Sequence, residues 1–315
     1  MRNHLRLLLI PVLLMQTIGL LAQTKLPGYY KESRSLSASL QNILKEAGID
    51  SSYDADEDGR LKVSLAVIDL RGKKPLFGGV NHDQFIYPAS VYKMYVAMEV
   101  LRQVSQGEYS LFKSYVVRTP NDVDRSKEIS FDPRPLLKNG DTVTIRYLLD
   151  LMITRSDNTA ANCLIDIAGR KRINQTMKEY GWEGSEVTRK FLKRSVEDPG
   201  YDTIRSTVTC ALHAADFMYR ICTGQLVNHW VSNEMKVLLG AQLDTTKLAT
   251  GLSRGMMFYH KTGWWSMYTH DVGWAEDESS KFIIAVFMPL KEEEAIPKMK
   301  IIAEKISSLM RKGKD

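Results

Sequence analysis

Cysteine is scarce in this sequence, because the 315 residues include only Cys163, Cys210 and Cys222. Secreted scaffolds that depend on disulfides are far richer in cysteine, so the chain is not of that class. Cys210 and Cys222 lie in one expected helix, and the helical rise of about 18 Å between them is too long for a disulfide. We therefore expect buried free thiols.

Patterns that bind metals or nucleic acid are also missing. The six histidines form no H-E-x-x-H or similar motif and there is no zinc-finger spacing, so we expect no metal and no cofactor. The formal net charge of +6 is dispersed, and no basic helix carries interleaved aromatic residues. We therefore expect no nucleic-acid partner.

Long apolar runs are absent except at residues 7–22, LLLIPVLLMQTIGLLA, which follow Arg2 and Arg6 and end in a small residue. This is typical of a secretory signal peptide. A membrane anchor is the alternative, but a span needs about 20 apolar residues and polar residues interrupt this run. We expect cleavage after residue 22, a secreted or periplasmic location, and no stable membrane span afterwards. No cysteine lies near the cleavage site for lipid attachment.

Repeats, low-complexity tracts and obvious linkers are absent as well, which favours one large domain or two interlocked subdomains. Periodicity predicts strands near both ends of the chain and helices between them. Strands are expected at 61–70, 75–80, 256–262, 267–275 and 281–289. Helices are expected at 32–47, 90–105, 144–153, 159–168, 170–180, 207–223, 230–242 and 292–311. This order favours one sheet assembled from both ends, with an all-helical insert.

The sequence does contain three short motifs that carry chemistry, and the first is S-V-Y-K at residues 90–93. Positions i and i+3 share one face of a helix, so the amine of Lys93 can reach the Ser90 hydroxyl. A helix N-terminus also favours negative charge near Ser90, and both effects activate an alcohol nucleophile. The spacing alone is weak evidence, because Ser110 and Lys113 share it.

The other two motifs are S-D-N at residues 156–158, between two expected helices, and H-K-T-G at residues 260–263, late in an expected strand. Each has an ordinary explanation by itself, as a helix N-cap and as a strand end with a turn glycine. Their order and context favour function: S-x-x-K opens a helix, S-D-N joins helices and K-T-G lies on a strand.

This combination resembles the serine β-lactamase and penicillin-binding-protein superfamily, and class A β-lactamases in particular. The resemblance covers nearly all of the chain after residue 22. It implies an α/β (α+β) fold of the β-lactamase/transpeptidase type, in which an antiparallel sheet flanked by the N- and C-terminal helices lies beside an all-helical lobe. The α/β lobe would comprise about residues 25–87 and 245–315 and the helical lobe about residues 88–244, with the site at their seam.

The resemblance also implies a role for each motif residue. Ser90 would be the acylated nucleophile, and Lys93 its proton partner. Ser156 would pass a proton to the leaving nitrogen, with Lys261 tuning it. The oxyanion hole would consist of the backbone N–H groups of Ser90 and Trp264. The implied substrate-binding residues are Asn158, Lys261, Thr262, Gly263 and Trp264.

The loop TRKFLKRSVEDPGYD at residues 188–202 departs from the class A pattern. Class A enzymes carry there a Glu, within E-x-x-x-N, that positions the water for hydrolysis of the acyl-enzyme. Counting along the loop predicts Lys193 or Arg194 at this position. Glu197 is the nearest acid, and no Asn follows it four residues later. Glu197 is therefore the candidate catalytic base, with an exposed Glu in a charged loop as the alternative.

A second departure follows K-T-G, where Trp264 and Trp265 replace residues that are usually small in the family. They predict an apolar wall of the site, with a core or lid position as the alternative. Residues 264–280 contain no Arg to hold a substrate carboxylate. The remaining candidates to bind it are Lys261, Thr262, His270, Arg220 and Arg254.

The leading prediction is a secreted serine hydrolase that acts through an acyl-Ser90 intermediate and opens β-lactam rings. One alternative is a D-alanyl-D-alanine peptidase, or another amidase or esterase, which acylates in the same way without the class A Glu. Another is a slowly acylated binding or sensor module. In each case the partner is a small molecule, a β-lactam or a cell-wall peptide, and we expect a monomer.

Overall fold

The computed structural model describes residues 24–55, 58–123, 132–200 and 203–311. The expected signal peptide at residues 1–22 lies outside these ranges. Across the described ranges, no helix combines the length and the apolar character needed to cross a lipid bilayer.

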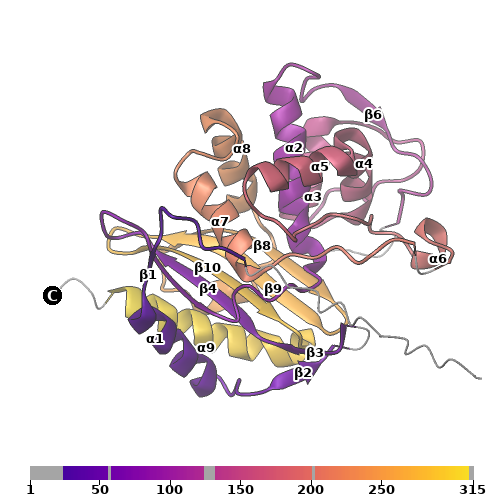
Figure 1. Ribbon diagram of the computed structural model, residues 1–315. Helices are drawn as coiled ribbons and strands as arrows, with labels where there is room; N and C mark the ends of the chain where they lie inside the picture. The colour runs from indigo at the N-terminus through magenta and orange to yellow at the C-terminus, as the bar shows by residue number, and fades with distance from the viewer. Residues whose placement is uncertain (1–23, 56–57, 124–131, 201–202, 312–315) are drawn as a thin grey trace, which may run out of the picture.

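A six-stranded sheet runs through the lower half of the molecule in Figure 1, in the order β1-β5-β4-β10-β9-β8. Its strands are β1 (Lys31–Glu32), β4 (Ser64–Asp69), β5 (Leu76–Val80), β8 (Met257–Trp265), β9 (Tyr268–Glu276) and β10 (Lys281–Met288). The short β1 pairs in parallel with β5, and the other neighbours pair antiparallel. Strands from both ends of the chain meet where β4 pairs with β10, which confirms the predicted sheet.

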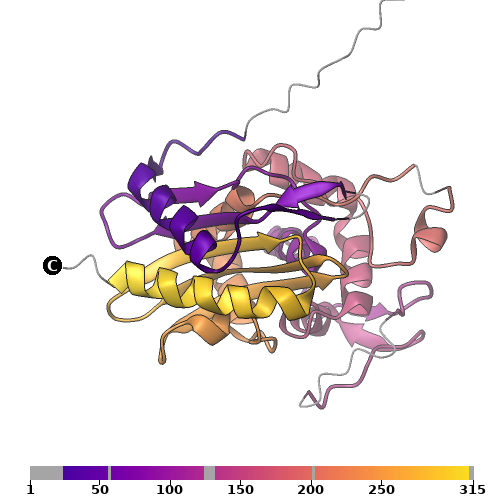
Figure 2. The ribbon, with the colours of Figure 1, turned by 90° about the horizontal axis from the view of Figure 1, so that it is seen from below.

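The centre of the sheet is buried on both faces. The even-numbered residues of β10, from Phe282 to Met288, pack in a core with α1 (Arg34–Glu46) and α9 (Glu292–Arg311). The odd-numbered residues, from Ile283 to Phe287, join the other core beneath α7 (Ala211–Cys222). Successive side chains of a strand point to opposite faces, which explains why KFIIAVFM is apolar almost throughout. Figure 2 shows α1 and α9 together on their face of the sheet.

Helices fill the segment between the two groups of strands (Figure 1). They are η2 (Ala89–Tyr92), α2 (Lys93–Ser105), α3 (Ile145–Thr154), α4 (Asn158–Ala168), α5 (Arg170–Glu179), α6 (Arg194–Glu197), α7, α8 (His229–Gly240) and η3 (Leu248–Gly251). Helix α2 is buried along most of its length and packs against α3, α4, α5 and α8. A helix that is enclosed on all sides is a rigid support for residues at its N-terminus.

The predicted elements are confirmed within a few residues, but the insert is not wholly helical. Strands β6 (Ser114–Val116) and β7 (Thr142–Thr144) pair antiparallel, and neither strand was predicted from the sequence. Strands β2 (Ser52–Asp54) and β3 (Arg60–Lys62) form a second small pair. Strands of three residues are too short to show an alternating pattern in the sequence.

The three cysteines are free thiols, as predicted. Cys163 and Cys210 are buried, whereas Cys222 is only half-buried. Burial raises the pKa of the Cys163 and Cys210 thiols to about 12, so both remain protonated and unreactive at neutral pH.

Candidate active site

Ser90 lies in η2, the single turn that leads directly into α2, and Lys93 is the first residue of α2. Ala89, immediately before Ser90, has a φ of +46°, a left-handed conformation that residues other than glycine rarely adopt. Such strain persists only where the surrounding structure enforces it, and it is common at functional sites. The turn that presents Ser90 is therefore held by its neighbours.

One of these neighbours is His270 in β9. Its Nε2–H donates to the carbonyl oxygen of Tyr87 at 2.9 Å, and its Nδ1 accepts from the backbone N–H of Met288 at 3.2 Å. Burial lowers the pKa of His270 to about 3, so the ring is neutral. Both ring nitrogens therefore form hydrogen bonds within the protein. Through them His270 connects Tyr87, just before η2, to Met288 in the sheet. The interpretation that it binds a substrate carboxylate is wrong.

Lys93 connects the S-x-x-K motif to the S-D-N motif. Its Nζ donates to the carbonyl oxygen of Ser156 at 2.5 Å and to Asn158 Oδ1 at 2.7 Å, and it lies 3.2 Å from Ser156 Oγ. Ser156 has a φ of +60°, which brings its carbonyl and its hydroxyl to the same amine. Lys93 is 0% exposed, whereas Ser156 and Asn158 are half-buried, so the amine lies beneath the surface that these two residues share.

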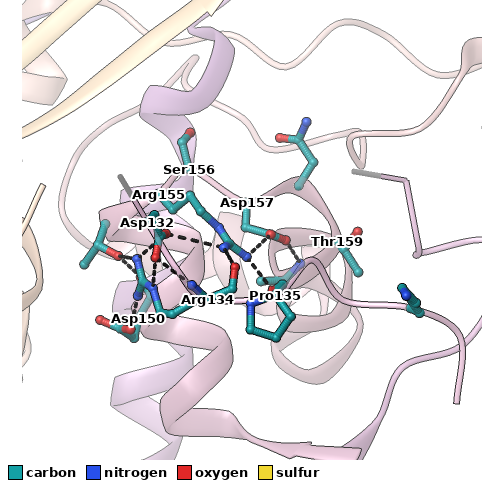
Figure 3. A network of polar contacts seen from close by, with 12 residues as sticks. Asp132, Arg134, Pro135, Asp150, Arg155, Ser156, Asp157 and Thr159 are labelled. Carbon is teal, nitrogen blue, oxygen red and sulfur yellow. Dashed lines mark hydrogen bonds and ion pairs between the residues drawn. The ribbon is translucent and has the colours of Figure 1, made fainter. Parts of the chain in front are cut away.

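A network of polar contacts behind Ser156 fixes this turn (Figure 3). Asp157 accepts a backbone N–H from the first turn of α4 at 2.8 Å and pairs with Arg155 at 3.0 Å. Arg155 in turn donates to the carbonyl oxygens of Arg134 at 2.6 Å and Pro135 at 3.1 Å. In Figure 3 the Ser156 side chain points away from this network. Asp157 and Arg155 are therefore structural, and the hydroxyl of Ser156 faces the site instead.

Asp157→Ala is expected to lower the free energy of unfolding by about 3–5 kcal/mol, because it removes the helix cap and a buried partner of Arg155. Asp157→Asn keeps an oxygen for the cap and serves as the matched control, with a smaller loss. Urea denaturation of the three proteins measures the difference. A loss below about 1 kcal/mol for the alanine variant would show that this network does not stabilise the turn.

The K-T-G strand β8 approaches η2, the turn that contains Ser90, through its glycine. A Cβ on Gly263 would lie 2.7 Å from the carbonyl oxygen of Pro88 and 3.0 Å from Val91 Cγ2, so only glycine allows β8 to pack this closely on η2. Lys261 is 0% exposed, and its Nζ donates to the carbonyl oxygen of Thr262 at 2.9 Å. The three motifs thus converge around η2.

Trp264 and Trp265 end β8 with side chains 48% and 63% exposed, so the alternative of a core position is wrong. Of the two arginines proposed to hold a substrate carboxylate, Arg220 donates to Asp216 at 2.8 Å. Arg254 is exposed in the turn that precedes β8. Among the described residues, no group of three His, Cys, Asp or Glu side chains could hold a metal ion.

The loop that follows Thr188 covers Lys93 with Phe191. The centroid of the Phe191 ring lies 4.2 Å from Lys93 Nζ, and the ring stacks on Tyr92 at 4.6 Å with an interplanar angle of 6°. Asn162 in α4 holds the backbone of Phe191 from both sides, with a 2.7 Å bond to its N–H and a 3.3 Å bond to its carbonyl oxygen.

Counting along the loop predicts Lys193 or Arg194 at the position of the class A Glu. Lys193 is exposed and precedes α6, which contains Arg194. The position of Phe191 over Lys93 was missed in the sequence. The available signal was Asn162, four residues after Asn158 and so on the same side of α4, but nothing in the sequence indicated which loop residue its amide would bind.

Glu197 is bound within the same loop. Its carboxylate accepts from the backbone N–H of Lys190 at 2.8 and 3.1 Å and from Arg170 at 2.9 Å, and Arg189 lies 3.7 Å away. The side chain is 7% exposed, so the alternative of an exposed Glu is wrong as well. Helix α6, which ends in Glu197, lies at the outer edge of the molecule in Figures 1 and 2.

Comparison with known proteins gives consistent results. Residues 37–310 match the family described as the beta-lactamase enzyme family. Beta-lactamase AST-1 of Nocardia asteroides is 28% identical over 167 residues, which are 51% of this chain and 53% of that protein. The chain thus spans about half the length of this curated relative.

Solved structures show the same fold. The structure of PBP-A has a TM-score of 0.73 at 19% identity, covering 90% of this chain and 98% of that one. A single-residue mutant of PBP-A, described as an acyl-enzyme complex with penicillin G, has a TM-score of 0.71 at 19% identity and covers 89% and 97%. A beta-lactamase from Sphaerobacter thermophilus has a TM-score of 0.71 at 20% identity and covers 87% and 97%.

Proposed function

The chain belongs to the beta-lactamase enzyme family, and from that premise we propose that it is a serine hydrolase acylated on Ser90 by β-lactams. One observation carries the proposal. Lys93, which is buried and lies three residues after Ser90 in the sequence, contacts the S-D-N turn. The relatives named as β-lactamases, and the penicillin G complex of PBP-A, support β-lactams as the substrate class.

Acylation needs a path for one proton. Ser90 Oγ attacks the amide carbonyl carbon, the Oγ–C bond forms and the C–N bond breaks. The proton that leaves Ser90 passes by way of Lys93 to Ser156, which gives it to the leaving nitrogen. The 3.2 Å between Lys93 Nζ and Ser156 Oγ is short enough for this transfer.

The remaining site residues bind the substrate in this proposal. Asn158 holds the acyl-amide side chain, and Thr262 with Lys261 receives the carboxylate. The backbone N–H groups of Ser90 and Trp264 stabilise the oxyanion, and each such donor contributes about 3 kcal/mol to lowering the barrier. We also propose that the protein is exported and that its two lobes divide near residues 87 and 245.

Gly263→Ala is expected to slow acylation by about 100-fold, because a methyl group would push β8 away from η2 and misplace the oxyanion-hole donor. Gly72→Ala is the matched control, since its nearest neighbour would be an ordinary 3.5 Å from the new Cβ. The rate of labelling by a fluorescent penicillin compares the two variants. Equal rates in both would show that close packing at Gly263 is irrelevant to the reaction.

Purified protein incubated with penicillin G tests the proposal as a whole. Intact mass spectrometry reports acylation, and absorbance reports opening of the β-lactam ring. We expect a gain of one penicillin mass per chain, ring opening, or both. A D-alanyl-D-alanine peptide, tested separately, addresses the peptidase alternative. If neither adduct nor ring opening occurs with any β-lactam, the proposal fails.

A further inference from the structure

We infer that Phe191 shields the Ser90 acyl-enzyme from water, so that the protein keeps its acyl group far longer than it takes to acquire it. The inference rests on the proposed acylation of Ser90. It favours a long-lived covalent receptor for β-lactams over an efficient hydrolase.

The position of the Phe191 ring is fixed by contacts on several sides. The buried amide of Asn162 holds the backbone of Phe191, and the ring lies flat against Tyr92. The hydroxyl of Tyr92 donates to the carbonyl oxygen of Arg189, two residues before Phe191. The loop is therefore bound to both η2 and α4 around this ring. The ring cannot move away from Lys93 without breaking these contacts.

The ring covers the amine of Lys93, the residue three positions after Ser90. Phe191 approaches Lys93 Nζ at 4.2 Å, and Lys93 is itself 0% exposed. A cation over an aromatic face is stabilised, so the ring and Lys93 favour staying together. A water molecule at the face of the Phe191 ring would contact hydrocarbon and find no hydrogen-bond partner there. Losing those hydrogen bonds costs free energy.

Hydrolysis of the acyl-enzyme requires more than access of water to the acyl carbon. The oxygen of water bonds to the acyl carbon, the bond from that carbon to Ser90 Oγ breaks, and one proton of the water ends on Ser90 Oγ. An efficient reaction needs a group beside the water that accepts its proton in the transition state. The Phe191 ring has no atom that does so.

Glu197 belongs to the support of this ring. Its carboxylate accepts from the N–H of Lys190, the residue directly before Phe191, and from Arg170. Moving Glu197 toward Ser90 would break these bonds and open the turn that places the ring. The loop thus uses its nearest acid to hold Phe191 over Lys93.

The lifetime of the adduct tests the inference. Full-length wild type, Phe191→Glu and Phe191→Leu are loaded with penicillin G, freed from excess drug by rapid gel filtration, and followed by intact mass spectrometry. The wild-type adduct should persist for hours. Phe191→Glu should lose it about 100-fold faster, because a carboxylate beside Lys93 can accept a proton from water. Phe191→Leu is the apolar matched control and should retain the adduct.

The outcomes separate this inference from the proposed function. A wild type that is neither acylated nor opens the β-lactam ring contradicts acylation of Ser90 itself. A wild type that is acylated but sheds its adduct within seconds, with continuing ring opening, overturns the role of Phe191 and leaves acylation intact. Equal acceleration by glutamate and leucine also overturns it, since loosening of the loop would then be the cause. If Phe191→Glu fails to fold, the wild-type lifetime still decides.

Discussion

Replacing Ser90 by alanine is expected to abolish covalent labelling by penicillin, a loss on the order of 10⁶-fold in rate. In the proposed mechanism Ser90 Oγ is the atom that bonds to the acyl carbon, and water cannot substitute for it in forming an adduct. A fluorescent penicillin, resolved on a denaturing gel, measures the labelling directly.

The chain supplies its own control for this prediction. Ser110 has the same spacing to Lys113 that Ser90 has to Lys93, but Ser110 is exposed and its Oγ accepts from the N–H of Phe112 at 3.1 Å. Ser110→Ala should label like the wild type. Persistent labelling of Ser90→Ala would mean that another residue is acylated and that the motif has been misread.

The second large effect concerns Lys93. Lys93→Met should slow acylation by about 10³-fold, because it removes the amine that carries the proton from Ser90 to Ser156 in the proposed mechanism while keeping a side chain of similar length. The same change also takes one hydrogen-bond donor away from Ser156 and Asn158, so circular dichroism must confirm that the variant is folded. Stopped-flow measurement of acylation gives the rate.

Lys113→Met is the matched control, because Lys113 is exposed and lies 5.7 Å from the ring of Tyr109, on the surface of the molecule. It should acylate at the wild-type rate. If folded Lys93→Met acylates within about threefold of the wild type, Lys93 is not the proton partner of Ser90 and another group must take the proton.

The sequence predicted most of the fold because the main elements are long and strongly patterned. The apolar run of β10 and the amphipathic α9 each extend over eight or more residues, so their periods are clear. The small β6–β7 pair was not predicted, because three residues carry too little pattern. A single sheet was predicted from strands at both ends of the chain, but the pairing of β4 with β10 that joins them was not.

The loop around Phe191 was beyond sequence reasoning for a physical reason. Counting residues assumes that a loop has a fixed length, whereas its path is set by contacts such as those from Asn162 to Phe191 and from Glu197 to Lys190. These contacts join residues that are far apart or follow no local pattern. The structural role of His270 could not be predicted for the same reason. Its hydrogen-bond partners are Tyr87 and Met288, and no sequence motif connects the three residues.

The most direct test of the account is the site of acylation in the wild-type protein. The protein is exposed to penicillin G, quenched in acid within seconds, digested with a protease, and mapped by tandem mass spectrometry. We predict one penicillin on the peptide that contains Ser90, with none on the peptides that contain Ser110 or Ser156. An adduct on any other residue, or a chain that neither carries an adduct nor opens the β-lactam ring, would contradict it.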